Sequence, residues 1–374
     1  MSTLPSSPPS SATSALLRKA AVVLLAGGAT LSLTAGPAQA ASPGWETLAK
    51  PNTDGSLYDV LPVGDGSTAF GQTVWGRNSG DAEVVRYWLR QGTAWKELTY
   101  EKDRADDGIW AATSANDFWV LGKKYQQSLS VSHWNGTAWE KRNPADASVN
   151  FRGIKAVSAT DVWAVGESRT DTATSVPGVV GHWDGTSWKV TKLPQAAGGS
   201  TKLNSVQVNS ATDIWAAGQT CTDVAGTNCR PYVVKYDGAN WKEVATPTGL
   251  TGSLTKIVAR GSGDVWVVGG TTALHWNGTG WTRADITLKG VTSFADLAFY
   301  GGQLYAGLHS GTDGAFARWN GQAWEAVTGP VSYSADGVRL TTATDGSLWV
   351  AGRTMSFFGS SSPFAARLAA PAAG

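Results

Sequence analysis

Basic and acidic side chains recur together in a repeated motif, which raises the question of a metal site. One position of the repeat holds a histidine in three copies and a lysine or arginine in three others: His133, His182, His275, Lys235, Arg318 and Arg367. A position that accepts any cation is not a ligand position, and separate copies would hold their imidazoles too far apart to share one ion. The sequence therefore predicts structural pairs such as Asp161–His182 and Asp213–Lys235, and no zinc or copper site.

Two aspartates and three basic residues could together perform acid–base chemistry. Asp59 and Asp296 could serve as base and acid, while Lys155, Lys256 or Arg339 stabilised an anion. These residues are grouped by their position in the repeat and not by a known catalytic motif. The chain has no GxSxG elbow, phosphate-binding loop, HExxH or EF-hand loop. An enzymatic role is thus left open.

The cysteines and one acidic loop complete the residues with distinctive chemistry. Cys221 and Cys229 are the two cysteines of the chain, and outside the cell they are expected to form a disulfide that staples one loop. Asp103, Asp106 and Asp107 could hold calcium weakly, because hard oxygen ligands suit that ion. The alternative is a solvated acidic loop, and no other cofactor is expected.

A repeat must position these residues. An aromatic pair flanks an Asn-Gly or Asp-Gly turn in HWNGTAW (133–139), HWDGTSW (182–188), KYDGANW (235–241), HWNGTGW (275–281) and RWNGQAW (318–324). Both dipeptides tolerate positive φ and favour tight hairpins. A second motif of the DVWAVG type lies upstream of each pair. Four short strands recurring at roughly 45-residue spacing predict a β-propeller.

The two ends of the repeat region complete each other. Residues 364–369 resemble a third strand that no fourth strand follows, and residues 44–48 resemble a fourth strand that no blade precedes. Joining them closes a ring and removes exposed sheet edges. The sequence therefore predicts an all-β, seven-bladed β-propeller of four-stranded antiparallel blades over residues 41–370. The N-terminal strand completes the last blade, and the protein is expected to be a monomer.

Two segments resemble a known repeat family. YVVKYDGANWKEVATP (232–247) and DVWVVGGTTALHWNGTGW (264–281) are similar to kelch repeats, in which a glycine pair ends the second strand and a spaced Tyr and Trp follow. Only Gly269-Gly270 keeps that pair. The DVWAVG strand also resembles tectonin-type lectin propellers. The resemblance covers nearly all of the chain after residue 40 and implies the propeller fold. The copper site of kelch-containing galactose oxidases has no match here, because both cysteines are assigned to the loop.

Most of the 19 tryptophans fall at repeated strand positions, where large aromatic side chains should pack between blades. Trp75 and Trp110 fall outside that register. The first strands were aligned on one apolar residue each, which pairs Ile109 with Ile154. The residues flanking that position do not repeat, and by strand alternation they share one side, toward the ring centre. The resulting ligand candidates are Asp59, Trp110, Lys155, Gln207, Lys256, Asp296 and Arg339. A wet channel with assorted polar residues is the alternative.

The first forty residues have the order of an export signal. Arg18 and Lys19 precede an apolar run over residues 20–33, which ends at Ala38-Gln39-Ala40. The run contains Gly27-Gly28 and is too short for a membrane span, so residues 1–40 are expected to be cleaved and the protein to be secreted without a membrane anchor. The chain has 30 Lys and Arg against 29 Asp and Glu, which excludes a nucleic-acid-binding protein driven by bulk charge.

These observations favour a secreted, non-catalytic binding protein. Variable loops on a rigid scaffold are where function concentrates, so the loop-rich face and the central funnel are expected to bind a glycan or an extracellular protein. The loops differ between blades, which disfavours a multivalent lectin relative to a single central site. One alternative is a lyase or hydrolase acting in the funnel. Another is an inhibitor of a secreted enzyme, with a flat apolar loop face near Trp75 and Tyr125.

Overall fold

The computed structural model describes residues 44–52, 56–75, 84–98, 109–122, 130–169, 174–195, 198–310, 315–331, 335–355 and 361–371. The expected export signal, Tyr125 and the acidic loop with Asp103, Asp106 and Asp107 lie outside these ranges. Among the described residues, no helix is long and apolar enough to cross a membrane.

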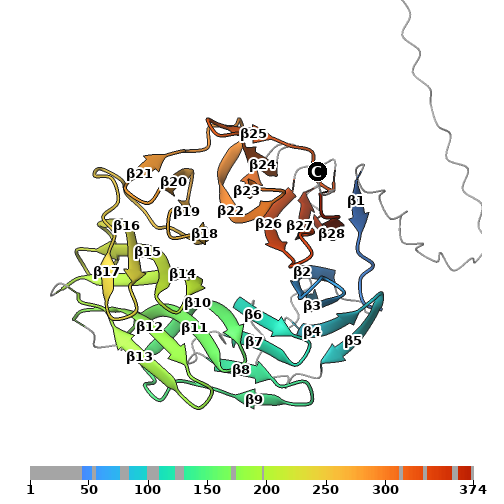
Figure 1. Ribbon diagram of the computed structural model, residues 1–374, viewed down its shortest axis with the longest axis horizontal. Coiled ribbons are helices and arrows are strands. Elements are labelled where there is room, and N and C mark those ends of the chain that lie inside the picture. The colour runs from blue at the N-terminus through green and yellow to red at the C-terminus, as the bar shows by residue number, and fades with distance from the viewer. Residues whose placement is uncertain are drawn as a thin grey trace, which may run out of the picture. The chain divides into compact units, whose positions relative to one another are not determined.

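The described residues form seven four-stranded antiparallel sheets arranged as the blades of a propeller (Figure 1). Blades 1 and 2 comprise β2 (Ser56–Val63), β3 (Thr68–Trp75), β4 (Val84–Gln91) and β5 (Ala94–Leu98), then β6 (Ile109–Ser114), β7 (Asp117–Gly122), β8 (Ser130–Trp134) and β9 (Trp139–Lys141). Blades 3 and 4 comprise β10 (Val149–Ser158), β11 (Asp161–Ser168), β12 (Gly178–Trp183) and β13 (Trp188–Lys192), then β14 (Ser200–Ser210), β15 (Asp213–Cys221), β16 (Cys229–Tyr236) and β17 (Trp241–Glu243). Blades 5 and 6 comprise β18 (Lys256–Gly261), β19 (Asp264–Gly269), β20 (Thr272–Trp276) and β21 (Trp281–Arg283), then β22 (Val291–Tyr300), β23 (Gln303–Ser310), β24 (Phe316–Trp319) and β25 (Trp324–Ala326).

Blade 7 contains both ends of the repeat region, as predicted. Its strands are β26 (Ala335–Thr342), β27 (Leu348–Met355), β28 (Ser361–Leu368) and the N-terminal β1 (Trp45–Thr47), which pairs with β28. Trp45 lies opposite Leu368, and the Leu48 amide continues the ladder by donating to the Ala365 carbonyl at 2.9 Å. The prediction of a seven-bladed ring closed by its N-terminal strand is therefore confirmed.

The hairpin turns follow from the Asp-Gly and Asn-Gly pairs. In the β12–β13 turn, the Asp184 carboxylate accepts the backbone N–H groups of Thr186 and Ser187, each at 3.0 Å. Gly185 has φ of 93°, and a Cβ there would lie 2.9 Å from the Thr160 side chain. The turn sequence thus satisfies both the backbone hydrogen bonds and the positive φ that it requires.

The core lies between neighbouring blades and is largely aromatic. Trp119 of blade 2 is fully buried against Trp183 and Trp188 of blade 3, with ring centroids 5.5 and 6.0 Å away. The Trp188 indole also donates to the Arg142 carbonyl of the preceding blade at 2.5 Å. This contact, here called the interblade indole bond, recurs from Trp324 to the Ala284 carbonyl at 2.6 Å. Repeated tryptophans therefore hold adjacent blades together, as the sequence predicted.

Candidate functional site

The repeated acidic and basic residues form structural clusters. Asp161 Oδ1 accepts both the Trp163 indole N–H and the His182 imidazole, each at 2.9 Å, and the two rings stack with centroids 4.1 Å apart. In blade 4, Lys235 is 3.1 Å from Asp213 and lies over the Trp215 ring. Both predicted pairs are thus confirmed. Each blade that has this Asp–Trp–cation cluster uses it to fix its second and third strands.

These clusters occupy the imidazoles and carboxylates that a metal would need. Burial would raise the pKa of Asp117, but hydrogen bonds from His133, Thr113 and Trp119 outweigh it and hold that pKa below its usual value. The carboxylate is therefore stabilised in its charged form by its own blade. Within the described ranges, no group of three or more His, Cys, Asp or Glu side chains could hold a metal ion.

The first strands β2, β6, β10, β14, β18, β22 and β26 lie around the centre of the ring (Figure 1). In five of these strands the pairing register shifts just before the residue that flanks the aligned apolar position: Asp59, Gly153, Ser205, Asp296 and Arg339. A bulge of this kind re-aims the next side chain. The side chains of Ser205 and Asp296 consequently reach the first strand of the next blade, where they accept backbone N–H groups.

Five of the predicted residues form a charged group at this inner rim, here called the inner cluster: Asp59, Lys155, Lys256, Asp296 and Arg339. Lys256 forms an ion pair with Asp296. The charges of Arg339 and Asp296 act on the pKa of Asp59, and the charge of Lys256 acts on the pKa of Lys155. They come from blades 1, 3, 5, 6 and 7, so they are brought together only by ring closure. The sequence alignment therefore identified residues that interact across the centre of the ring.

Asp296 is the structural member of the inner cluster. Its side chain is 5% exposed and lies 2.6 Å from Lys256 Nζ. It also accepts the Leu297 amide at 2.8 Å and the Leu340 amide of blade 7 at 3.1 Å. A carboxylate with three donors therefore joins blades 5, 6 and 7, and most of its hydrogen-bonding capacity is used within the fold.

Asp59 is a member of the inner cluster whose pKa is raised. Burial raises its pKa to about 6, opposed by the charge of Arg339 and reinforced by that of Asp296. It accepts the Val60 amide at 2.8 Å and the Trp110 indole N–H at 3.1 Å. Asp59 is thus a carboxyl group whose charge changes within the physiological pH range.

Lys155 and Arg339 are the unpaired cations of the inner cluster. Lys155 keeps access to solvent, yet dehydration by the surrounding protein, together with the charge of Lys256, lowers its pKa. Arg339 is exposed and acts electrostatically on Asp59. Neither makes an ion pair or hydrogen bond in the part of the chain that the structure describes. The inner rim therefore presents two basic groups that are available to a ligand.

The register of blade 2 differs from the predicted alignment by one residue. Trp110 lies opposite Val120 and Ala111 opposite Trp119, whereas in blade 3 Lys155 lies opposite the corresponding tryptophan. Trp110 of blade 2 therefore corresponds to Ile154 of blade 3, the apolar position of the alignment. Ile109, which is 42% exposed, corresponds to the residue before it. Trp110 packs between blades 1 and 2, and it meets the inner cluster only through its indole N–H.

The remaining predicted residues do not join the inner cluster among the side chains that the structure describes. Gln207 donates to Asn209 at 3.2 Å and makes no hydrogen bond to the five charged residues within the described part of the chain. Trp75 ends β3, but its side chain, like Tyr125, lies outside the described residues. Cys221 and Cys229 form the predicted disulfide, and they face each other at the ends of β15 and β16.

The raised pKa of Asp59 predicts how Asp59→Asn changes stability with pH. A carboxyl group that holds its proton more tightly when folded stabilises the protein fully below about pH 4, and this contribution is lost as pH rises through about 6. Asp59→Asn should therefore gain thermal stability relative to wild type between pH 4 and 6, by at most about 3 kcal/mol, and hold that gain at pH 7–8. Melting curves at each pH measure it.

Asp65→Asn is the control for that titration. Asp65 is exposed, and its hydrogen bonds from Ser67 lower its pKa, so this variant should instead be less stable than wild type at pH 7 and approach it as the pH falls. A pH-independent difference between Asp59→Asn and wild type would show that Asp59 has an ordinary pKa.

Comparisons with known proteins support the fold. No protein-family model matches the chain, and no curated protein matches its sequence. The structure is similar to that of YCF48 bound to a D1 peptide, with a TM-score of 0.55, 16% identity, 90% of this chain covered and 100% of that chain. It is also similar to the β-propeller domain of the Trilobed protease from Pyrococcus furiosus, with a TM-score of 0.55, 8% identity and coverage of 83% and 93%. The chain is thus a seven-bladed β-propeller, and its kelch-like or tectonin-like affiliation stays a prediction.

Proposed function

We propose that the protein is a secreted, non-catalytic binding protein that takes one anionic ligand at the centre of its ring. The observation that carries this proposal is the pair of unpartnered cations, Lys155 and Arg339, on the inner rim. Dehydration by the surrounding protein and, after it, the charge of Lys256 lower the pKa of Lys155. A partly dehydrated basic group attracts a negative charge more strongly than a fully solvated one.

The ligand we infer carries a carboxylate, supplied by an extracellular protein segment or an acidic glycan. Lys155, Lys256 and Arg339 bring three positive charges to the inner cluster, whereas Asp296 already neutralises Lys256 at 2.6 Å. Asp59 and the indole N–H of Trp110 add hydrogen-bonding capacity beside them. Because YCF48 was solved with a bound peptide, peptides form one arm of the test and oligouronates the other.

The test compares ligand-induced thermal stabilisation and calorimetric affinity in wild type and in Lys155→Met/Arg339→Met. Wild type should be stabilised by acidic peptides with a free carboxyl terminus or by oligogalacturonate, because a ligand of the native state raises its stability with occupancy. The double variant should bind at least about tenfold more weakly, since charge-assisted bonds are the strong ones. Lys96→Met, which removes an exposed cation of β5, is the control. Equal binding by the double variant, or no binding in either arm, would refute the proposal.

A funnel hydrolase or lyase is the second candidate, favoured by the pKa of about 6 at Asp59. A carboxyl group titrating near neutrality suits a general base. Asp296 is occupied by Lys256 and two backbone amides, so the second acid expected from the sequence would have to come from elsewhere. Mass spectrometry of the bound ligand after incubation separates the two functions. Binding predicts an unchanged ligand, and catalysis predicts a product that Asp59→Asn fails to form.

A further inference from the structure

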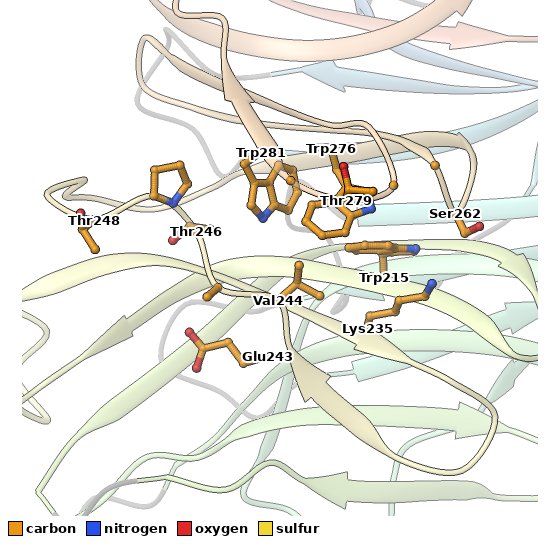
Figure 2. Close-up of a pocket in the computed structure, with 15 residues that line it drawn as sticks. Trp215, Lys235, Glu243, Val244, Thr246, Thr248, Ser262, Trp276, Thr279 and Trp281 are labelled. Carbon is orange, nitrogen blue, oxygen red and sulfur yellow. The ribbon is translucent and has the colours of Figure 1, made fainter.

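A cavity of about 730 Å³ lies between blades 4 and 5, away from the inner cluster. Its walls are Trp276 and Trp281 of blade 5 on one side and residues 243–248, which run on from the end of β17, on the other (Figure 2). Trp215 and Lys235 of blade 4 also line it. The size is typical of sites for small organic ligands.

This cavity lies where an interblade indole bond is missing. In two other blades, the tryptophan that opens the fourth strand donates to the carbonyl of the residue that follows the preceding blade's fourth strand: Trp188 to Arg142 and Trp324 to Ala284. The corresponding pair here is Trp281 and Val244, since Val244 follows β17 as Ala284 follows β21. Trp281 Nε1 is buried and has no acceptor among the residues that the structure describes. A buried donor without a partner is costly, so this N–H calls for a ligand acceptor.

The two charged side chains that line the cavity, Lys235 and Glu243, are each paired within the protein, so an ionic ligand would gain little from them. Lys235 pairs with Asp213 at 3.1 Å, and Glu243 pairs with Arg230 at 2.7 Å. The remaining recognition groups include the Trp281 N–H, the partly exposed indoles of Trp276 and Trp281, whose centroids are 5.4 Å apart, and the hydroxyl groups of the threonine and serine residues that line the cavity. An occupant should therefore combine a neutral apolar face with hydroxyl oxygens.

We infer that the groove between blades 4 and 5 is a saccharide-binding site, in which a pyranose ring packs on the indole surface and a sugar hydroxyl accepts the Trp281 N–H. A purely apolar ligand would leave that donor unpaired, and an anion would meet the Glu243 carboxylate. A second cavity, of about 380 Å³, lies at the same place between blades 3 and 4, lined by Trp163, His182, Tyr236 and Trp241. Blades 4 and 5 hold the larger site.

The test is calorimetric titration of the purified protein with cellotriose, chitotriose, xylotriose and maltotriose. At least one of them should bind wild type. Trp281→Phe keeps an aromatic face and loses the donor, so it should weaken that affinity about tenfold with little change in melting temperature, because no internal hydrogen bond is lost. Trp324→Phe is the matched control. It loses the bond to the Ala284 carbonyl, so it should lower the melting temperature and leave saccharide affinity unchanged.

Three results would overturn the inference. The first is that none of the four trisaccharides binds, and the second is that Trp281→Phe binds as tightly as wild type. The third is that Trp281→Phe destabilises the protein as much as Trp324→Phe does, which would mean that its N–H is bonded within the fold. Lys155→Met/Arg339→Met should keep full saccharide affinity, so the groove and the ring-centre proposal succeed or fail separately.

Discussion

Deletion of residues 44–48 should destabilise the propeller by about 5 kcal/mol or more and cause it to self-associate. The deletion removes β1, with Trp45 packed 6.1 Å from Phe316 and Leu48 only 5% exposed in the core shared by blades 1 and 7. Each large apolar side chain contributes roughly 2–3 kcal/mol through burial. The unpaired edge of β28 would then offer its backbone groups to other chains. Thermal denaturation and size-exclusion chromatography measure the two effects.

Glu46→Ala is the control for the deletion. Glu46 lies in the same strand with an exposed side chain, and its replacement should leave the melting temperature within about 1 °C of wild type, as is usual for surface positions. A deletion variant that melts like wild type would contradict closure of the ring by β1.

Asp117→Ala should cost about 3–5 kcal/mol of stability, because it leaves two buried ring N–H groups without their acceptor, at about 1–3 kcal/mol each. Asp117 and His133 are 2% and 8% exposed, and Trp119 is fully buried. The substitution removes the carboxylate that accepts hydrogen bonds from the Trp119 indole at 2.8 Å and the His133 imidazole at 2.9 Å. Because the folded Asp117 has a lowered pKa, the advantage of wild type should be complete above about pH 4 and shrink as the pH falls further. Denaturant titrations at several pH values measure this.

Asp161→Ala provides the matched comparison. It removes the same bonds to Trp163 and His182, but the Asp161 side chain is 39% exposed and that of His182 is 32% exposed. Water can replace the lost acceptor there, so the cost should be about 1 kcal/mol or less. Equal losses in the two variants would show that burial does not set the strength of the Asp–Trp–cation cluster.

Much of the fold could be predicted because each blade repeats its own local signals. The Asp184-Gly185 turn, the Trp163–His182 stack and the orphan strand around Trp45 are all visible as short motifs or as mismatched ends. The error at Trp110 arose from matching first strands by apolarity alone, since Ile109 and Trp110 are both apolar. The tryptophan of the second strand, Trp119 in blade 2, gives the correct register. In every blade that has this tryptophan, it lies opposite the same position of the first strand.

The residues of the inner cluster were predicted, but their mutual contacts and the groove were not. Alignment found all five members of the cluster, whereas their interactions cross blades separated by tens to hundreds of residues, which no local pattern encodes. The burial that raises the pKa of Asp59 depends on ring closure. Likewise, the sequence of blade 5 makes Trp281 look like any other core tryptophan. Only the structure shows how its indole N–H is placed relative to the carbonyl groups of blade 4.

The pairing of Trp45 with Leu368 also has a consequence for biosynthesis. A ribosome makes β1 before all of the other strands and β28 after them, so β1 must wait unpaired while every intervening blade is translated. A prematurely terminated product would lack the sheet that β1 joins. The finished architecture is therefore available only to the complete polypeptide, and truncated chains would present the open edges on which quality-control proteases and chaperones act.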